Sequence, residues 1–92
     1  MSKNSQTCMI TMTGFILATD YNRRGKVLEI ALESEDFKQY IITSNQKGKE
    51  LFERLCSKVT VSGCVTGEDV DGNPIFEITD YEIVERNVFI KE

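Results

Sequence analysis

The residues best suited to bind a ligand form a basic cluster around a single glycine, in the stretch DYNRRGK at positions 20–26. Two more lysines follow Asn45, where a helix is expected to begin, and they oppose the helix dipole by roughly a few tenths of a kcal/mol each, so local stability does not explain them. Single-stranded nucleic acid is held by cations on phosphates and by aromatic rings on bases. The candidate nucleic-acid-binding residues are Tyr21, Arg23, Arg24, Lys26, Lys47 and Lys49.

The overall charge limits this interpretation. The chain carries a net charge of −4, whereas proteins that bind nucleic acid by electrostatics alone are usually basic. The charge is uneven: residues 1–26 hold four basic side chains and one acidic side chain, for +3, and residues 27–92 hold seven basic and fourteen acidic side chains, for −7. Exposed lysines and arginines that serve only solubility therefore remain the alternative.

An acidic stretch, GEDVDGNP at 67–74, suggests a second chemistry. Asp69, Asp71 and Asn73 have the alternate spacing that opens a calcium-binding loop, with Asp80 twelfth in the count. The match then fails, because Pro74 replaces the glycine of the tight turn and no bidentate glutamate follows. The Asp-Gly pair predicts a hairpin turn instead, and we expect no metal site or cofactor.

Catalysis is not expected. The chain has no histidine, so a Ser-His or Cys-His pair cannot form within it, and it has no glycine-rich phosphate loop. Three cysteines, Cys8, Cys56 and Cys64, show no paired spacing, and we expect reduced thiols. The longest apolar run near the N-terminus, 15–18, is too short for a signal peptide or a membrane span, so a cytoplasmic protein without membrane contact is expected.

The positioning elements are mostly strands. In residues 9–19 apolar side chains alternate with threonines, which predicts a strand buried on one face, and Gly14 in its middle predicts a bulge or bend. In the next strand, 26–33, Leu28, Ile30 and Leu32 are expected to point inward. In a third strand, 37–44, Tyr40 and Ile42 are expected to point inward, and the opposite parity would bury Phe37 and Ile41 instead. A helix of about three turns is expected from Asn45 to Cys56.

Two more strands follow the helix. Residues 58–66 alternate Val59, Val61 and Val65 around a central glycine, and residues 75–84 begin with Phe76 and Ile78 inward. The inward parity then switches to Tyr81 and Ile83, which predicts a bulge at Thr79 or Asp80.

The resulting order of three strands, one helix and two strands resembles the OB-fold, a five-stranded Greek-key β-barrel with one helix between strands 3 and 4. The stretch 58–84 is also similar to the closing hairpin of small stand-alone bacterial OB domains, grouped with the tRNA-anticodon-binding or single-strand-binding superfamily. We expect one domain over residues 1–92, with the barrel at about 9–84 and flanking tails at 1–8 and 85–92.

The resemblance implies a non-enzymatic binding domain. In OB-folds that bind nucleic acid, the ligand crosses strands 2 and 3, between the loop joining strands 1 and 2 and the loop joining strands 4 and 5. The first of these loops is basic here and the second is acidic. Weak binding of single-stranded DNA or RNA is the leading hypothesis, and a module that binds a protein partner or a second copy of itself is the alternative.

Overall fold

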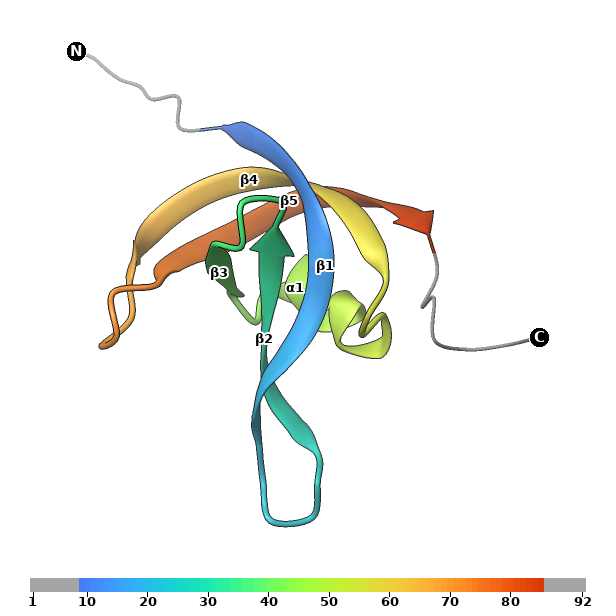
Figure 1. The fold of residues 1–92 in the computed structure, drawn as a ribbon, viewed down its shortest axis with the longest axis vertical. Coiled ribbons are helices and arrows are strands. Elements are labelled where there is room, and N and C mark those ends of the chain that lie inside the picture. Colours follow the sequence, from blue (N-terminus) through green and yellow to red (C-terminus); the bar gives the residue numbers. More distant parts are fainter. Residues whose placement is uncertain (1–8, 86–92) are drawn as a thin grey trace.

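The computed structural model describes residues 9–85, which form a closed five-stranded barrel with an OB-like fold (Figure 1). The strand order around the barrel is β1-β2-β3-β5-β4, and all neighbouring strands are antiparallel except β3 and β5. The fold class predicted from the sequence is confirmed. The strands are β1 (Ile10–Tyr21), β2 (Val27–Ser34), β3 (Gln39–Ile42), β4 (Lys58–Glu68) and β5 (Pro74–Glu85).

Strand β1 belongs to both sides of the barrel. Residues 10–15 pair with β4 and residues 14–21 pair with β2, so the strand must change partners near Gly14. A Cβ atom on Gly14 would lie 2.2 Å from the carbonyl oxygen of Glu33, closer than any side chain allows. The register continues through Gly14 without a shift. The glycine therefore permits close contact between strands, and of the two features expected here, a bulge or a bend, the bulge is absent.

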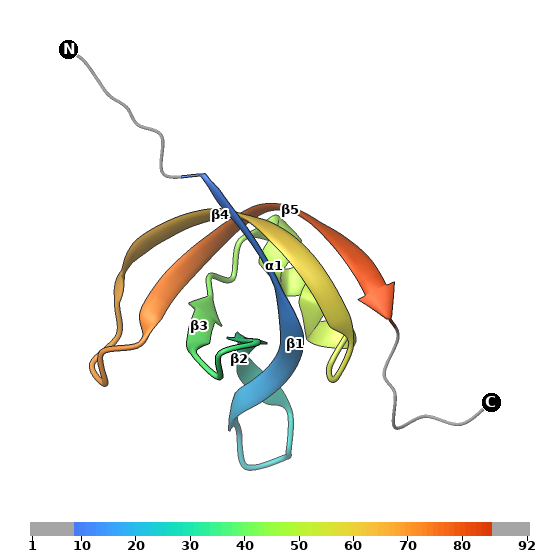
Figure 2. The same ribbon diagram turned by 45° about the horizontal axis from the view of Figure 1, so that its top comes forward.

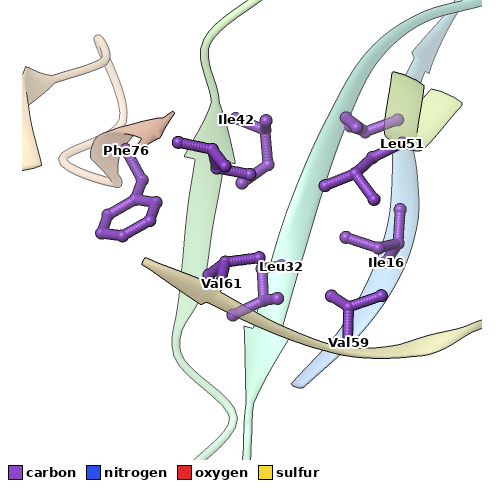
Figure 3. Close-up of a cluster of buried hydrophobic side chains, with 9 residues drawn as sticks. Ile16, Leu32, Ile42, Leu51, Val59, Val61 and Phe76 are labelled. Atoms are coloured by element: carbon purple, nitrogen blue, oxygen red, sulfur yellow. The ribbon is translucent and has the colours of Figure 1, made fainter. Parts of the chain in front are cut away.

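The barrel interior is filled by apolar side chains from all five strands and the helical segment (Figure 3). The prediction that Tyr40 and Ile42 point inward is confirmed: Ile42 is buried, and Tyr40 packs against the core with its ring edge-to-face on Phe76 at 6.1 Å between centroids. Burial of this apolar surface is the main force that holds the barrel closed. The buried cluster is Ile16, Ile30, Leu32, Ile42, Leu51, Val59, Val61, Phe76 and Ile78.

The bulge predicted in β5 is confirmed. Ser62 pairs with Asp80 and Gly63 pairs with Ile78, which leaves Thr79 as an extra residue on β5. One extra residue moves the following side chains to the other face, so Tyr81 and Ile83 turn toward the core as Ile78 does before them.

The prediction that Leu28 points inward is wrong. Leu28 is 49% exposed, and its neighbour Val27 packs against the core instead. The pairing of β1 with β2 shifts twice near the end of the hairpin, and the second shift leaves Leu28 without a partner residue. A shift of one residue exchanges the two faces of a strand, so an alternation that holds at Ile30 fails beyond the shift.

The helical segment is shorter than expected. Helix α1 (Gln46–Glu50) continues into one turn of 3-10 helix, η1 (Leu51–Glu53), and lies under the arch of β4 and β5 (Figure 2). Asn45 caps it as predicted, because its Oδ1 accepts a hydrogen bond of 2.8 Å from the Gly48 N–H. The side-chain Nδ2 of Asn45 also donates to the Ile78 carbonyl at 2.9 Å, which fixes the helix start against β5.

The cysteines differ from the expectation of reduced thiols. Cys56 is a half-buried free thiol, whereas Cys64 is disulfide-bonded, and its partner lies outside the described residues. Cys56 has a positive φ of 66°, so the backbone turns there and the helix cannot extend through it. Over residues 9–85, no helix has the length and apolar character needed to cross a membrane.

Candidate ligand-binding turns

Three hairpin turns of five residues share one backbone geometry. In each turn the first and fifth residues are bonded through backbone N–H and C=O groups, and the N–H of the fourth residue donates to the carbonyl of the first. The fourth residue has a positive φ. This is a type I turn followed by a residue in the left-handed region, a common hairpin connection. The three turns span residues 22–26, 34–38 and 69–73.

The first residue of each turn also fixes the loop with its side chain. Asn22 Oδ1 accepts hydrogen bonds from the backbone N–H groups of Arg24 and Lys26, at 2.8 and 2.9 Å. The Asp69 carboxylate does the same in the turn between β4 and β5, with the N–H groups of Asp71 and Asn73. Ser34 is the counterpart in the middle turn, where its hydroxyl donates to the Asp36 carboxylate. All three turns are therefore held in one conformation, which fixes the backbone positions from which the side chains at their tips extend.

The turn between β1 and β2 presents the basic cluster. The hairpin projects away from the barrel, with the turn at its far end (Figure 1). Arg23, Arg24 and Lys26 are exposed there, and Tyr21 is 56% exposed at the base of the turn. Within residues 9–85, none of these three cations lies in an ion pair. The charges are therefore available to a ligand.

Lys47 and Lys49 do not join this cluster. They are exposed on α1, which both ribbon views place apart from the β1–β2 turn (Figures 1 and 2). Lys47 Nζ lies 5.8 Å from the centroid of the Tyr81 ring, a cation–π distance. The Tyr81 hydroxyl donates to Glu50 at 2.6 Å, and this bond raises the pKa of the Tyr81 phenol. The structure thus divides the six candidate residues into a turn group and a helix group.

The turn between β4 and β5 is acidic. Backbone N–H donation from Asn73 lowers the pKa of the Asp69 carboxyl, because the bond stabilises the charged form. Both carboxylate oxygens of Asp69 accept hydrogen bonds from inside the turn. Across the described part of the chain, no group of three or more acidic or cysteine side chains is placed to hold a metal ion. Two residues of the calcium-like spacing, Asp69 and Asn73, bond to each other within the turn.

The sheet face between the two outer turns lacks a stacking platform. Tyr40 packs inward, and the opposite face of β2 and β3 carries half-buried Glu29 and Glu33 beside the buried residues Ala31 and Ile41. Carboxylates repel phosphates, and none of these side chains is aromatic. The face that binds nucleic acid in many OB-folds is unsuited to bases and phosphates in this chain.

The β2–β3 turn holds a feature that sequence reasoning missed. A hollow of about 250 Å³ lies beside it, with Phe15 of β1 and Phe37 of the turn among its lining residues. Phe37 is 82% exposed, and Phe15 is 38% exposed. Two exposed phenylalanines at one hollow are unusual for a surface that only contacts water. The lining residues are Gly14, Phe15, Glu33, Ser34, Glu35, Phe37 and Lys58.

Comparison with known proteins does not assign the site. No protein-family model matches the sequence, and no curated protein matches it significantly. The fold and the geometry of the three turns therefore carry the functional argument.

Proposed function

We propose that the protein is a non-enzymatic binding module that holds single-stranded nucleic acid at its β1–β2 turn. The observation that carries the proposal is the group of three exposed cations, Arg23, Arg24 and Lys26, on a rigid turn with Tyr21 at its base. The cations would contact phosphates, and the Tyr21 ring would stack on a base. The acidic sheet face next to the turn would confine the contact to a few nucleotides.

The number of cations sets the expected salt dependence. Each phosphate neutralised on a single strand contributes about −0.7 to the slope of log affinity against log salt, so three contacts give a slope of about −2. Affinity should then fall roughly twentyfold between about 50 and 200 mM salt. A larger slope would mean that the ligand reaches cations beyond the turn.

Titration of a labelled single-stranded oligonucleotide, followed by fluorescence anisotropy, tests the proposal. The variant Arg23→Gln/Arg24→Gln/Lys26→Gln should lose both the binding and the salt slope. The matched control is Lys47→Gln/Lys49→Gln/Arg54→Gln, which removes the same charge from exposed positions on the helical segment and should bind within about twofold of wild type. Equal loss of affinity in both variants would mean that binding depends only on net charge and not on the turn. Absence of binding by the wild type at low salt would refute the proposal.

A protein-interaction module is the second candidate, and one observation favours it. Val70, at the tip of the acidic turn, is 101% exposed, and the hollow at the β2–β3 turn adds two exposed phenylalanines. Apolar side chains held at rigid turns contribute to protein interfaces more than to phosphate binding. The oligonucleotide titration separates the two candidates, because a protein-interaction module has no reason to bind nucleic acid with this slope.

A further inference from the structure

The hollow beside the β2–β3 turn has room for a guest between two aromatic rings. Phe15 and Phe37 both line it, yet their rings form no ring contact with each other. Phe37 is 82% exposed, so its ring packs against little of its own chain. The ring is therefore free to lie against a group that enters the hollow.

The chemistry of the lining favours a flat cation. Glu33 and Glu35 contribute two carboxylates, against one ammonium group from Lys58. In the described residues none of these three groups forms an ion pair, so both carboxylates are open to a second cation. Aromatic faces attract cations, and a guanidinium group can stack on a ring while it donates to a carboxylate. An arginine side chain is the best match.

The position of Phe37 in its turn shows that the fold does not require this side chain. Gly25 and Gly72 occupy the same fourth position in the other two turns, with φ of 84° and 85°. Phe37 adopts φ of 67°, in the left-handed region that is strained for a residue with a Cβ atom. A residue that is exposed and strained at once is a candidate for function.

A second copy of this chain can supply the arginine. Arg23 and Arg24 extend from the β1–β2 turn, at the opposite end of β2 from Phe37 (Figure 1). The turn with the arginines is basic, and the hollow carries an acidic excess, so the two ends of one molecule are complementary. We propose that the hollow at Phe15 and Phe37 receives an arginine of the β1–β2 turn of a second copy, in a head-to-tail contact.

Such a contact is heterologous, since different surfaces meet, and the dimer as a whole keeps one free basic turn and one free hollow. Association therefore grows with concentration beyond the dimer. The same arginines bind nucleic acid in the proposed function, so an oligonucleotide should dissociate the assembly. The contact itself does not depend on nucleic acid and is tested without it.

Sedimentation velocity at rising protein concentration tests the contact. The wild type should form dimers and larger species, which high salt dissociates. Phe37→Gly removes the ring and relieves the backbone, so it weakens association at least about fivefold without a folding defect. Arg23→Gln/Arg24→Gln should weaken it at least as much. Lys58→Gln should strengthen it, because it removes the one cation from the hollow.

A mixture of the two weakened variants gives the decisive result. The Phe37→Gly chain keeps an intact basic turn, and the Arg23→Gln/Arg24→Gln chain keeps an intact hollow, so together they form one good interface. The mixture should contain a one-to-one dimer and no larger species, at a protein concentration where each variant alone is monomeric. A monomeric mixture, or a wild type that is monomeric at every concentration, would overturn the inference. Oligonucleotide binding by Phe37→Gly should match the wild type, so failure of the contact and failure of nucleic-acid binding are separate results.

Discussion

Replacement of Phe37 by glycine and by alanine should give stabilities in an unusual order. Both substitutions remove the ring, so the small burial of the Phe37 side chain is lost equally in both. Only alanine keeps a Cβ atom at the positive φ of this position. We therefore expect the glycine variant to be the more stable of the two, the reverse of the usual order within β-hairpins.

The size of the difference follows from two opposing contributions. A Cβ atom in the left-handed region costs roughly 1–2 kcal/mol, and the greater freedom of glycine in the unfolded chain costs roughly 0.5–1 kcal/mol. The balance favours Phe37→Gly over Phe37→Ala by about 0.5–1 kcal/mol, which corresponds to roughly 3–6 °C in Tm for a domain of this size. Both hydrogen bonds that close the turn, from Ser34 to Lys38 and from Phe37 to Ser34, use backbone atoms and survive in both variants.

Thermal and urea denaturation of the two variants measures this difference, and Val70 supplies the control. Val70 is fully exposed in the turn between β4 and β5, and its φ is not positive. There, Val70→Ala should be more stable than Val70→Gly by about 0.5–1 kcal/mol. If alanine is the more stable residue at both positions, Phe37 is not strained, and the argument that its ring is retained for binding fails.

Two further predictions concern the barrel and the helix. Gly63→Ala should lower the free energy of unfolding by at least about 3 kcal/mol, because its Cβ would lie 2.0 Å from the Glu77 carbonyl oxygen. Gly67→Ala on the same strand is the control, since its Cβ would enter open space and should change stability little. Urea denaturation measures both variants. The pKa of Tyr81 is raised above its ordinary value of 10.0 by the bond to Glu50, so its stabilising contribution is complete below pH 10 and is lost as pH rises through the folded pKa. Unfolding at a series of alkaline pH values should show this loss in the wild type and not in Tyr81→Phe; equal pH dependence would contradict it.

The sequence predicted the barrel because burial dictates its pattern. Each strand has one face against the core, so the alternation at Ile30 and Leu32 or at Val59 and Val61 follows from the hydrophobic effect. Even the bulge at Thr79 was predictable, since the apolar parity changes within one strand. Where a residue has to be buried, its position in the sequence determines its orientation.

The errors fall where burial no longer decides the structure. Leu28 lies near the end of a hairpin that extends beyond the barrel, and two register shifts there have no cost in core packing. The helical segment ends early because Arg54 leaves the helical region at φ −122°, and the positive φ of Cys56 then turns the backbone, which a helical pattern of leucines does not show. Cys64 was expected to be reduced from cysteine spacing alone, although bond formation depends on distances in the folded chain.

The candidate site was predicted only in part for the same reason. The cations at 23–26 are visible as an excess of charge, and Gly25 and Gly72 mark their turns in the sequence. Phe37 has no such signal in the sequence, because a phenylalanine favours a strand. Only the backbone hydrogen bonds and the positive φ show that it occupies the glycine position of a third, equivalent turn. The difference between this turn and the other two turns of the same chain is what marks Phe37. Two of the turns carry glycine at the position of positive φ, which is the residue that this backbone conformation favours. The third turn carries Phe37 there instead, beside the hollow lined by aromatic and acidic residues. Because stability does not explain Phe37 at this position, its presence requires another selective advantage.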